Sequence, residues 1–333
     1  MKVLLVGSGA VNLSVAGWLH PYVQELSFLV RTSKSELIDK GKFRCKYGDA
    51  DWQEFTCMAS SEISELSIPD IVVIGVKSYA LADVSAKISS AFGADIPVVS
   101  VLNGVRHIQV LEQTFRHVVL ATIFYNAYRV SPSEAVVVPG PIALSSSTDV
   151  KTVKQLRQAL SHSTPIKVID NPNDVAHCKL IMNLGNALQS IVGYHDNRSR
   201  DVPELQRLTA NLMWEGVQVL KKHGIKEVKL PGVPSWMLIK LAVILPSFIV
   251  VPIFNLKMKA LAINSMAQDV ANGSEETELE DLNGYLVELA EKLQVDVPYN
   301  KAIYQTFKKW NVIGAQPIKP SVLLSRINSF SNR

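Results

Sequence analysis

The residues best suited to chemistry come at the beginning of the chain, where an apolar run ends in a glycine-rich turn. Residues 1–6 read MKVLLV and lead into Gly7-Ser8-Gly9-Ala10-Val11. Gly7 permits a tight turn, and Gly9 lacks a Cβ, so the backbone can approach a pyrophosphate at the positive end of a following helix. The pattern predicts that residues 7–11 bind the phosphates of a dinucleotide. Asn12 replaces the third glycine of this fingerprint, which predicts a helix that packs farther from the strand beneath it.

A basic residue follows the second predicted strand. Residues 26–30 read LSFLV and end at Arg31, with Thr32, Ser33 and Lys34 behind it. In a βαβ unit the tip of the second strand lies beside the adenosine ribose. An acidic residue there would accept a hydrogen bond from the 2′-hydroxyl of NAD. Arginine suits the 2′-phosphate instead, by charge and by paired hydrogen bonds. We therefore expect NADPH or NADP+ as the cofactor, and a solvated basic loop is the alternative interpretation.

Two further polar residues end predicted strands. Lys77 follows the apolar run 71–76, and Asn103 follows the run 98–102. Open α/β sheets bind ligands beyond the carboxyl ends of their strands. A lysine or an asparagine there is often a plain turn residue. Because both stand at equivalent ends of successive strands, we expect Lys77 and Asn103 to contact the cofactor, and Asn103 also to contact the substrate.

A polar stripe runs along a later apolar helix. Lys179, Asn183 and Asn186 occur at helical spacing, so they are expected to project from one face. Apolar neighbours would desolvate the Lys179 ammonium, which would lower its pKa and make it a proton donor near neutral pH. A lysine whose tip reaches solvent is the alternative. His177 is interpreted as a surface residue without a role.

The elements that would position these residues form two domains. In residues 1–170, apolar strands alternate with helical segments at 79–91, 108–115 and 150–160, which predicts a Rossmann-type, doubly wound parallel sheet with an inserted hairpin at 42–58. From 171 to 333 nearly every segment has helical spacing, beginning with a helix capped by Asp174. The fold class is therefore α/β followed by a mainly α-helical domain.

Composition sets limits on the class of protein. The chain has 333 residues, 47% hydrophobic and 19% charged, with a net charge of +4 spread along the sequence, so nucleic-acid binding is not expected. The three cysteines, Cys45, Cys57 and Cys178, lack metal spacing and predict buried, reduced thiols and no metal site. The start of the chain does not resemble a secretory leader, which favours a cytoplasmic location.

One apolar segment stands out. Residues 241–254 read LAVILPSFIVVPIF, but this run is shorter than the roughly 20 residues that span a bilayer and contains Pro246 and Pro252. We interpret it as a buried, proline-interrupted part of the second domain and expect no membrane contact. An exposed oligomer surface, and with it a homodimer, is left open.

Taken in order, these features resemble the ketopantoate reductase family, the NADPH-dependent 2-dehydropantoate 2-reductases of pantothenate synthesis. The resemblance covers almost the whole chain. It is carried by GSGAV at Gly7, Arg31, VKS at Lys77, LNGV at Asn103, KLIMN at Lys179, SMAQD at Ser265 and TELEDLNG at Thr277.

For the cofactor, the resemblance implies that Gly7, Gly9 and the amides after them hold the pyrophosphate. Arg31 and Lys77 would select NADPH, and Asn103 would bridge cofactor and substrate.

For the reaction, the resemblance implies that Lys179 is the general acid that polarises and protonates a 2-keto oxygen. Asn183, Ser265 and Glu278 would orient the small 2-keto acid, and Glu278 would also influence the charge of the lysine. The family's second asparagine on the lysine helix falls at Ala187 here, with Asn186 one residue earlier.

The sequence therefore supports three candidate functions. The first is reduction of 2-dehydropantoate to (R)-pantoate with NADPH and without a metal. The second is a reductase or dehydrogenase that acts on another small 2-keto or 2-hydroxy acid. The third is a non-catalytic NADP-binding sensor, suggested by Asn12 and the apolar segment.

Overall fold

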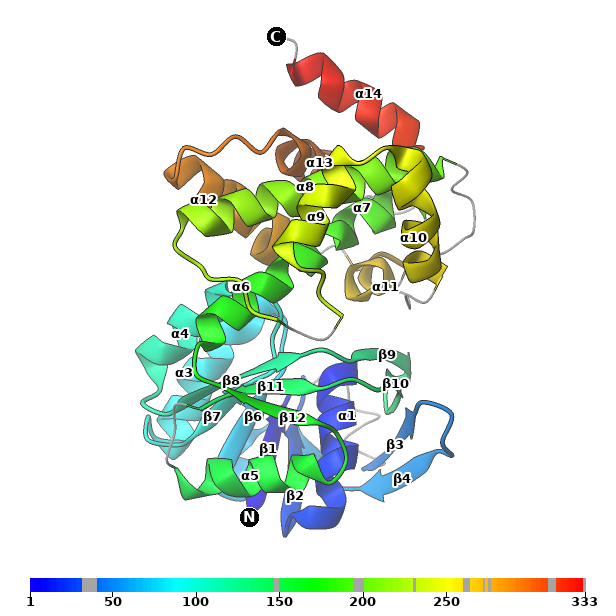
Figure 1. Ribbon diagram of the computed structural model, residues 1–333. Helices are drawn as coiled ribbons and strands as arrows, with labels where there is room; N and C mark the ends of the chain where they lie inside the picture. The colour runs from blue at the N-terminus through cyan, green and yellow to red at the C-terminus, as the bar shows by residue number, and fades with distance from the viewer. Residues whose placement is uncertain are drawn as a thin grey trace. The chain divides into compact units, whose positions relative to one another are not determined.

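The computed structural model describes residues 1–31, 41–146, 150–193, 201–229, 232–259, 264–271, 273–274, 277–310 and 316–331. The chain divides into two compact units, Met1–Asn173 and Asp174–Arg333 (Figure 1). Thr32, Ser33 and Lys34 lie outside the described residues.

The first unit is built on an eight-stranded sheet in the order β12-β11-β8-β7-β6-β1-β2-β5. Its strands are β1 (Lys2–Val6), β2 (Glu25–Leu29), β5 (Met58–Ser60), β6 (Ile71–Ile74), β7 (Val98–Ser100), β8 (Val118–Ile123), β11 (Ile142–Ser145) and β12 (Ile166–Ile169). All neighbours pair in parallel except β11, which runs antiparallel to β8. The predicted doubly wound sheet is thus confirmed, and the two strands at one edge, β11 and β12, run opposite to the other strands.

Helices cover both faces of this sheet, as the uninterrupted apolar strands predict. The helices are α1 (Ala10–Leu19), α3 (Leu81–Phe92), α4 (Arg106–Thr114) and α5 (Lys151–Ser161), with short 3-10 helices η1 (His20–Tyr22), η3 (Ile63–Glu65) and η4 (Ser78–Ala80). Val3 and Leu5 of β1 share a core cluster with α1 and α5. Leu4 and Val6 share another with α3 and α4. Successive β1 side chains therefore enter opposite cores, which fixes the strand between two helical layers.

A second, four-stranded sheet packs against α1. Its strands, in the order β4-β3-β10-β9, are β3 (Lys42–Tyr47), β4 (Gln53–Thr56), β9 (Asn126–Ser131) and β10 (Glu134–Val138). The predicted hairpin at 42–58 is β3–β4. In β10, Val136 and Val137 pair in parallel with Lys46 and Tyr47 of β3, so β10 belongs to this second sheet. The Tyr47 ring stacks on Trp18, and its hydroxyl donates to the carbonyl of Ser14, so β3 is fastened to α1.

The second unit is helical. Its elements are α6 (Pro172–Asn183), α7 (Gly185–Ile191), α8 (Val202–Lys222), α9 (Trp236–Ile244), α10 (Ser247–Lys259), α11 (Ser265–Ala271), the π-helix η6 (Glu280–Gly284), α12 (Tyr285–Lys292), α13 (Pro298–Trp310) and α14 (Pro320–Ser331). The long helix α8 contacts α7, α9, α10, α12, α13 and α14 (Figure 1). It is therefore the central element for these helices, while α11 packs on α7.

Two local predictions in this unit are wrong. The helix α6 begins at Pro172, so Asp174 lies in its first turn and is not its cap. Proline at the start of a helix needs no N–H partner, which explains the earlier start. The segment 241–254 is not buried, because α9 and α10 expose large side chains that include Ile244, Phe248 and Ile253. Pro246 separates the two helices, and Pro252 lies within α10.

Cys45, Cys57 and Cys178 are buried free thiols, as the sequence predicts. No helix of the described ranges has the length and apolar content needed to cross a bilayer.

Candidate functional site

In the first unit, the candidate cofactor residues follow four neighbouring strands. The strands β7, β6, β1 and β2 are adjacent in the sheet and parallel. The glycine turn follows β1, Arg31 follows β2, Lys77 follows β6 and Asn103 follows β7. Because β2 and β6 lie on opposite sides of β1, this edge is the topological switch point where open α/β sheets bind ligands.

The glycine turn has the geometry that close approach to a ligand requires. Gly7 has φ +91°, a left-handed conformation, and its N–H donates to the carbonyl of Leu29 at 2.9 Å. A Cβ at Gly7 would lie 3.0 Å from the carbonyl oxygen of Gly75. Gly9 is the extended N-cap of α1, and it supplies no side chain to cap the helix. The first amides of α1 are thus placed as in a phosphate-binding turn.

Asn12 fits between α1 and the sheet through a pair of hydrogen bonds. Its side chain is fully buried, and its Nδ2 donates to the carbonyls of Val6 and Gly7, both at 2.8 Å. The room comes from Gly75, where a Cβ would lie 2.5 Å from the Asn12 Oδ1. Asn12 therefore ties the helix to the end of β1 in place of the missing third glycine.

Arg31 pairs with an aromatic residue, Tyr79, that is not among the predicted site residues. Its guanidinium donates to the Tyr79 hydroxyl at 2.8 Å and lies 5.2 Å from the centre of the Tyr79 ring. Both side chains are exposed, Tyr79 by 50%. Tyr79 lies in η4, two residues after Lys77. Its position just beyond a strand end is the feature of the sequence by which it could have been predicted as a site residue. An arginine beside an exposed ring forms a surface that can stack on an adenine and pair with a phosphate.

Lys77 and Asn103 are half-buried at their strand ends. The Lys77 carbonyl accepts a hydrogen bond from the N–H of Ala80 at 3.0 Å, so Lys77 is the N-cap of η4. Asn103 stands before Gly104, whose φ of +80° makes the turn that leads toward α4.

In the second unit, a half-buried lysine lies within the field of a carboxylate. Lys179 is in α6 between buried neighbours Cys178 and Leu180. Desolvation lowers the pKa of Lys179 to about 8, while the Glu278 carboxylate acts in the opposite direction and favours the ammonium. A lysine with this pKa holds a proton near neutral pH and can give it up.

Ser265 and Glu278 form one cluster. The Ser265 hydroxyl donates to Glu278 Oε2 at 2.9 Å. Asn264, one residue earlier, accepts the N–H of Ala267 at 2.8 Å and donates to Gln189 of α7 at 3.0 Å. The start of α11 is therefore fixed to α7, and Ser265 in turn holds the carboxylate that acts on Lys179.

The lysine helix is interrupted between the two asparagines. Asn183 ends α6 and Asn186 lies in the first turn of α7, with Leu184 at the break, and both asparagines are half-buried. The Leu184 carbonyl accepts from the buried Asn283 side chain at 3.1 Å. Asn283 belongs to the π-helix η6, a form that often occurs at functional sites. In the sequence Asn283 stands out only as part of the TELEDLNG motif, and nothing in its local pattern indicates this contact.

The prediction that His177 lies on the surface is wrong, because His177 is only 2% exposed. Its Nε2 lies 2.9 Å from the Tyr285 hydroxyl, and its ring lies 5.8 Å from that of His223. Most sides of α6 are buried, so the helix lacks the apolar and polar faces by which a surface residue is recognised in a sequence.

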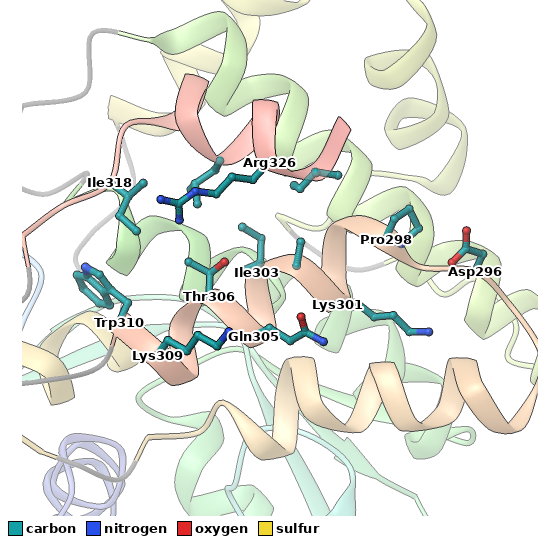
Figure 2. Close-up of a pocket in the computed structure, with 13 residues that line it drawn as sticks. Asp296, Pro298, Lys301, Ile303, Gln305, Thr306, Lys309, Trp310, Ile318 and Arg326 are labelled. Carbon is teal, nitrogen blue, oxygen red and sulfur yellow. The ribbon is translucent and has the colours of Figure 1, made fainter. Parts of the chain in front are cut away.

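A separate cavity of about 760 Å³ lies between α13 and α14 (Figure 2). It is lined by Ile303, Thr306, Trp310, Ile318 and Arg326 among others, and contains none of the predicted site residues. In the described part of the chain, no group of three or more His, Cys, Asp or Glu residues could hold a metal ion.

Comparison with protein families shows to which class of protein the chain belongs. Residues 3–149 match the model of the ketopantoate reductase PanE/ApbA family, and residues 173–311 match the model of its C-terminal domain. The chain is therefore an NAD(P)-dependent oxidoreductase. It belongs to the ketopantoate reductase family.

Individual relatives agree with this assignment. The chain is 24% identical to a 2-dehydropantoate 2-reductase of Aquifex aeolicus over 327 residues, which cover 92% of this chain and 96% of that protein. A PanE/ApbA family ketopantoate reductase from Ralstonia eutropha has a similar fold, with a TM-score of 0.75, 20% identity and coverage of 98% and 100%. D-mandelate dehydrogenase with NADH and anilino(oxo)acetate gives a TM-score of 0.75 at 18% identity, with coverage of 98% and 99%.

Proposed function

We propose that this protein reduces 2-dehydropantoate to (R)-pantoate with NADPH, in the cytoplasm, as a step of pantothenate and coenzyme A biosynthesis. The observation that carries the proposal is the Lys179–Glu278–Ser265 cluster, in which a half-buried lysine with a pKa of about 8 feels the field of a carboxylate that Ser265 orients. This is the arrangement that a general acid for a keto group needs. Membership of the ketopantoate reductase family supports the choice of substrate.

The residues of the first unit fit a dinucleotide. The glycine turn and the first amides of α1 would hold the pyrophosphate, because the backbone there can approach closely and no side chain caps the helix. Arg31 and Tyr79 would hold the adenosine end, with the guanidinium on the 2′-phosphate. Lys77 and Asn103 would contact the phosphates or the nicotinamide ribose.

When bound, NADPH would supply the hydride that reduces the 2-keto carbon. The Lys179 ammonium donates its proton to the keto oxygen as that oxygen gains negative charge, so the alkoxide becomes a hydroxyl. The neutral amine then takes a proton back from solvent. Glu278 favours the ammonium form and, with Ser265, would bind the hydroxyl end of the substrate, while Asn183 and Asn186 would orient its remaining polar groups.

A second candidate is reduction of a different 2-keto acid. The fold resembles D-mandelate dehydrogenase as well as it resembles a ketopantoate reductase, with a TM-score of 0.75 in each case. Asn186 in place of the expected asparagine at Ala187 also alters the substrate side of the helix.

The test is an assay of the purified protein at the nicotinamide absorbance, with NADPH or NADH and a panel of 2-keto acids that includes ketopantoate and an aromatic 2-keto acid. We expect ketopantoate with NADPH to give the highest kcat/KM. A higher value for another acid would support the second candidate. Absence of oxidation with every acid, by a protein that still binds NADPH, would support a sensor.

The variant Lys179→Ala tests the role of the lysine. We expect kcat to fall by about 10²- to 10⁴-fold, the usual contribution of a general acid, while NADPH affinity stays unchanged. Lys292→Ala, which removes an exposed lysine from the last turn of α12, is the matched control and should retain wild-type activity.

A further inference from the structure

The cavity between α13 and α14 has the size of a small-molecule site. Its volume of about 760 Å³ falls within the roughly 300–1,000 Å³ that ligand pockets usually occupy. All the residues that line it belong to the second unit, between Asp296 and Ile327. Its α14 side lies beyond residues 173–311, the part of the chain that matches the family's C-terminal domain. Membership of the family therefore does not account for this cavity.

Hydrogen bonds fix the α14 side of the cavity to the rest of the unit. The Ile318 N–H donates to the Ile191 carbonyl of α7 at 2.9 Å. At the end of α13, Trp310 Nε1 donates to the Gln316 carbonyl at 2.8 Å. Helix α14 also packs on α8. A cavity whose walls are held in this way is largely formed before a ligand enters, which lowers the cost of binding.

The inner wall of the cavity is apolar. Ile303 of α13 and Leu323 and Ile327 of α14 line it and are 0–2% exposed. Trp310 and Ile318 lie at one end of it (Figure 2). Because burial of hydrocarbon against such side chains removes apolar surface from water, this wall favours a ligand with an apolar body.

The outer wall carries an excess of positive charge. Of the described residues that line the cavity, Lys301, Lys309 and Arg326 are cationic and Asp296 alone is anionic. Glu291, which does not line the cavity, pairs with Lys301 at 3.6 Å. Lys309 and Arg326 are exposed, so an entering ligand meets positive charge first. This balance of charge favours an anion as the ligand.

The charges are separated along the cavity. Asp296 lies at one end and Trp310 at the other (Figure 2). The Arg326 guanidinium reaches from α14 toward the Trp310 end, where Thr306 of α13 also lies. The acidic head group of a ligand is therefore best placed beside Arg326 and away from Asp296.

We propose that this cavity binds a small amphipathic organic anion, a molecule with one carboxylate or phosphate head group and a short hydrocarbon body. The Arg326 guanidinium would pair with the head group through two parallel hydrogen bonds, and the Thr306 hydroxyl would donate a third. The hydrocarbon body would lie against Ile303, Leu323 and Ile327. Such a ligand complements both walls, whereas a short polar anion leaves the apolar wall wet and an alcohol supplies no negative charge.

The test is a ligand-observed NMR titration of the full-length protein with octanoate and with octyl phosphate. Acetate, methyl phosphate and 1-octanol, each of which keeps only one half of this chemistry, are the matched control ligands. We expect saturable binding of an octyl anion with a Kd of about 1 mM or below, and binding at least about ten-fold weaker for each control ligand. The tighter of the two octyl anions identifies the head group.

Two variants locate the site. Arg326→Gln removes the positive charge beside the head group and should raise the Kd by on the order of 10-fold. Ala302→Phe fills the cavity from α13 and should abolish binding. Arg207→Gln, which changes an exposed arginine of α8 that does not line the cavity, is the matched control and should bind as the wild type does. Circular dichroism shows whether each variant is folded.

A third variant separates the cavity from the exposed apolar side chains of α10. Phe248→Ser removes an apolar side chain that is 78% exposed, and it should leave the Kd unchanged. Loss of binding in this variant would overturn the proposal, because the octyl chain would then lie on α10.

Other results would also overturn the proposal. They are no binding of either octyl anion at about 10 mM, control ligands that bind as tightly as the octyl anions, or wild-type affinity in Arg326→Gln or in a folded Ala302→Phe. Because the titration contains no nicotinamide cofactor and no 2-keto acid, its outcome does not depend on the proposed function.

Discussion

The protonation of Lys179, which lies in the field of the Glu278 carboxylate, should be visible in kinetics. The lysine donates as an ammonium, so activity should fall as pH rises through its pKa of about 8. The Glu278 carboxylate raises that pKa, so its removal should lower it. In Glu278→Gln we expect the alkaline decline of log(kcat/KM) to begin at lower pH than in the wild type.

The measurement is a pH profile of kcat/KM for both proteins with the best 2-keto acid. Glu291→Gln, which neutralises an exposed carboxylate beside Lys301, is the control and should leave the profile in place. A Glu278→Gln enzyme that is slower but declines at the same pH would show that Glu278 only binds substrate.

Asn12 and Gly75 are a second pair at the residue scale. Gly75 does not have a positive φ, so alanine there is opposed by sterics alone, through its contact with the Asn12 Oδ1. We expect Gly75→Ala to reduce the free energy of unfolding by about 1–3 kcal/mol. Asn12→Gly should cost a similar amount, because it removes the donor to the Gly7 carbonyl and leaves a cavity.

The double variant should lose less than the sum of the two, since the new methyl group enters the space that Asn12 leaves. A urea-unfolding double-mutant cycle measures this, and we expect a coupling free energy of about 1 kcal/mol or more. Strict additivity would mean that the two residues do not share that space.

At the scale of elements, the start of α13 depends on a buried carboxyl group in α8. Glu215 accepts the N–H groups of Tyr299 and Asn300 and the Asn300 side chain at 2.8–2.9 Å. Burial raises the pKa of Glu215 to about 7, from an ordinary value of 4.5, against these hydrogen bonds. Between these values the folded chain keeps a proton that the unfolded chain releases, so this contribution is fully present below about pH 4.5 and is lost as pH rises through 7.

Lowering the pH from 8 to 5.5 should therefore stabilise the wild type relative to Glu215→Gln by about 2 kcal/mol. Urea unfolding of both proteins at the two pH values gives this difference. Glu112→Gln, an exposed carboxylate of α4, should behave as the wild type does. Equal pH dependence in the wild type and Glu215→Gln would contradict the assignment.

Individual elements show what the sequence could predict. The continuous apolar runs of β1 and β6 and their polar ends were recognisable because burial on both faces leaves a local pattern. The pairing of β10 with β3 was not, since these strands lie about ninety residues apart and alternation does not name a partner. Tyr79 was missed for a related reason, because its role depends on an arginine from a different strand end.

At the scale of the whole molecule, cofactor binding should stabilise the folded chain by mass action. NADPH at about 100 times its Kd would add about 2.7 kcal/mol, which corresponds to an increase of several degrees in Tm. At equal concentration we expect NADPH to raise Tm more than NADH does. Arg31→Ala should remove this preference, because it deletes the guanidinium expected to meet the 2′-phosphate.

Scanning calorimetry with each nucleotide tests the preference. Arg116→Ala removes an exposed arginine that pairs with Asp95, and it should leave the difference between NADPH and NADH unchanged. If the wild type responds equally to both nucleotides, Arg31 does not select the phosphate.

The segment 241–254 shows where sequence reasoning ends at this scale. Its apolar content predicts burial, but its side chains Ile244, Phe248 and Ile253 are exposed. The sequence does not distinguish burial in the chain's own core from contact with another molecule, because both environments favour apolar side chains. Only the burial of Trp236 and Ile239, together with the exposure of Phe248, separates the inner face from the outer one.

Trp18 gives this protein an optical signal of its own. It lies in the last turns of α1, the helix that begins at the glycine turn, and it is enclosed by aromatic rings, stacked on Tyr47 at 5.2 Å and edge-on to Tyr125 at 4.9 Å. Any shift of this helix when a nucleotide occupies its other end would alter the ring stacking. The emission of an unlabelled sample, in which Trp18 is one of five tryptophans, would then change as the coenzyme site fills.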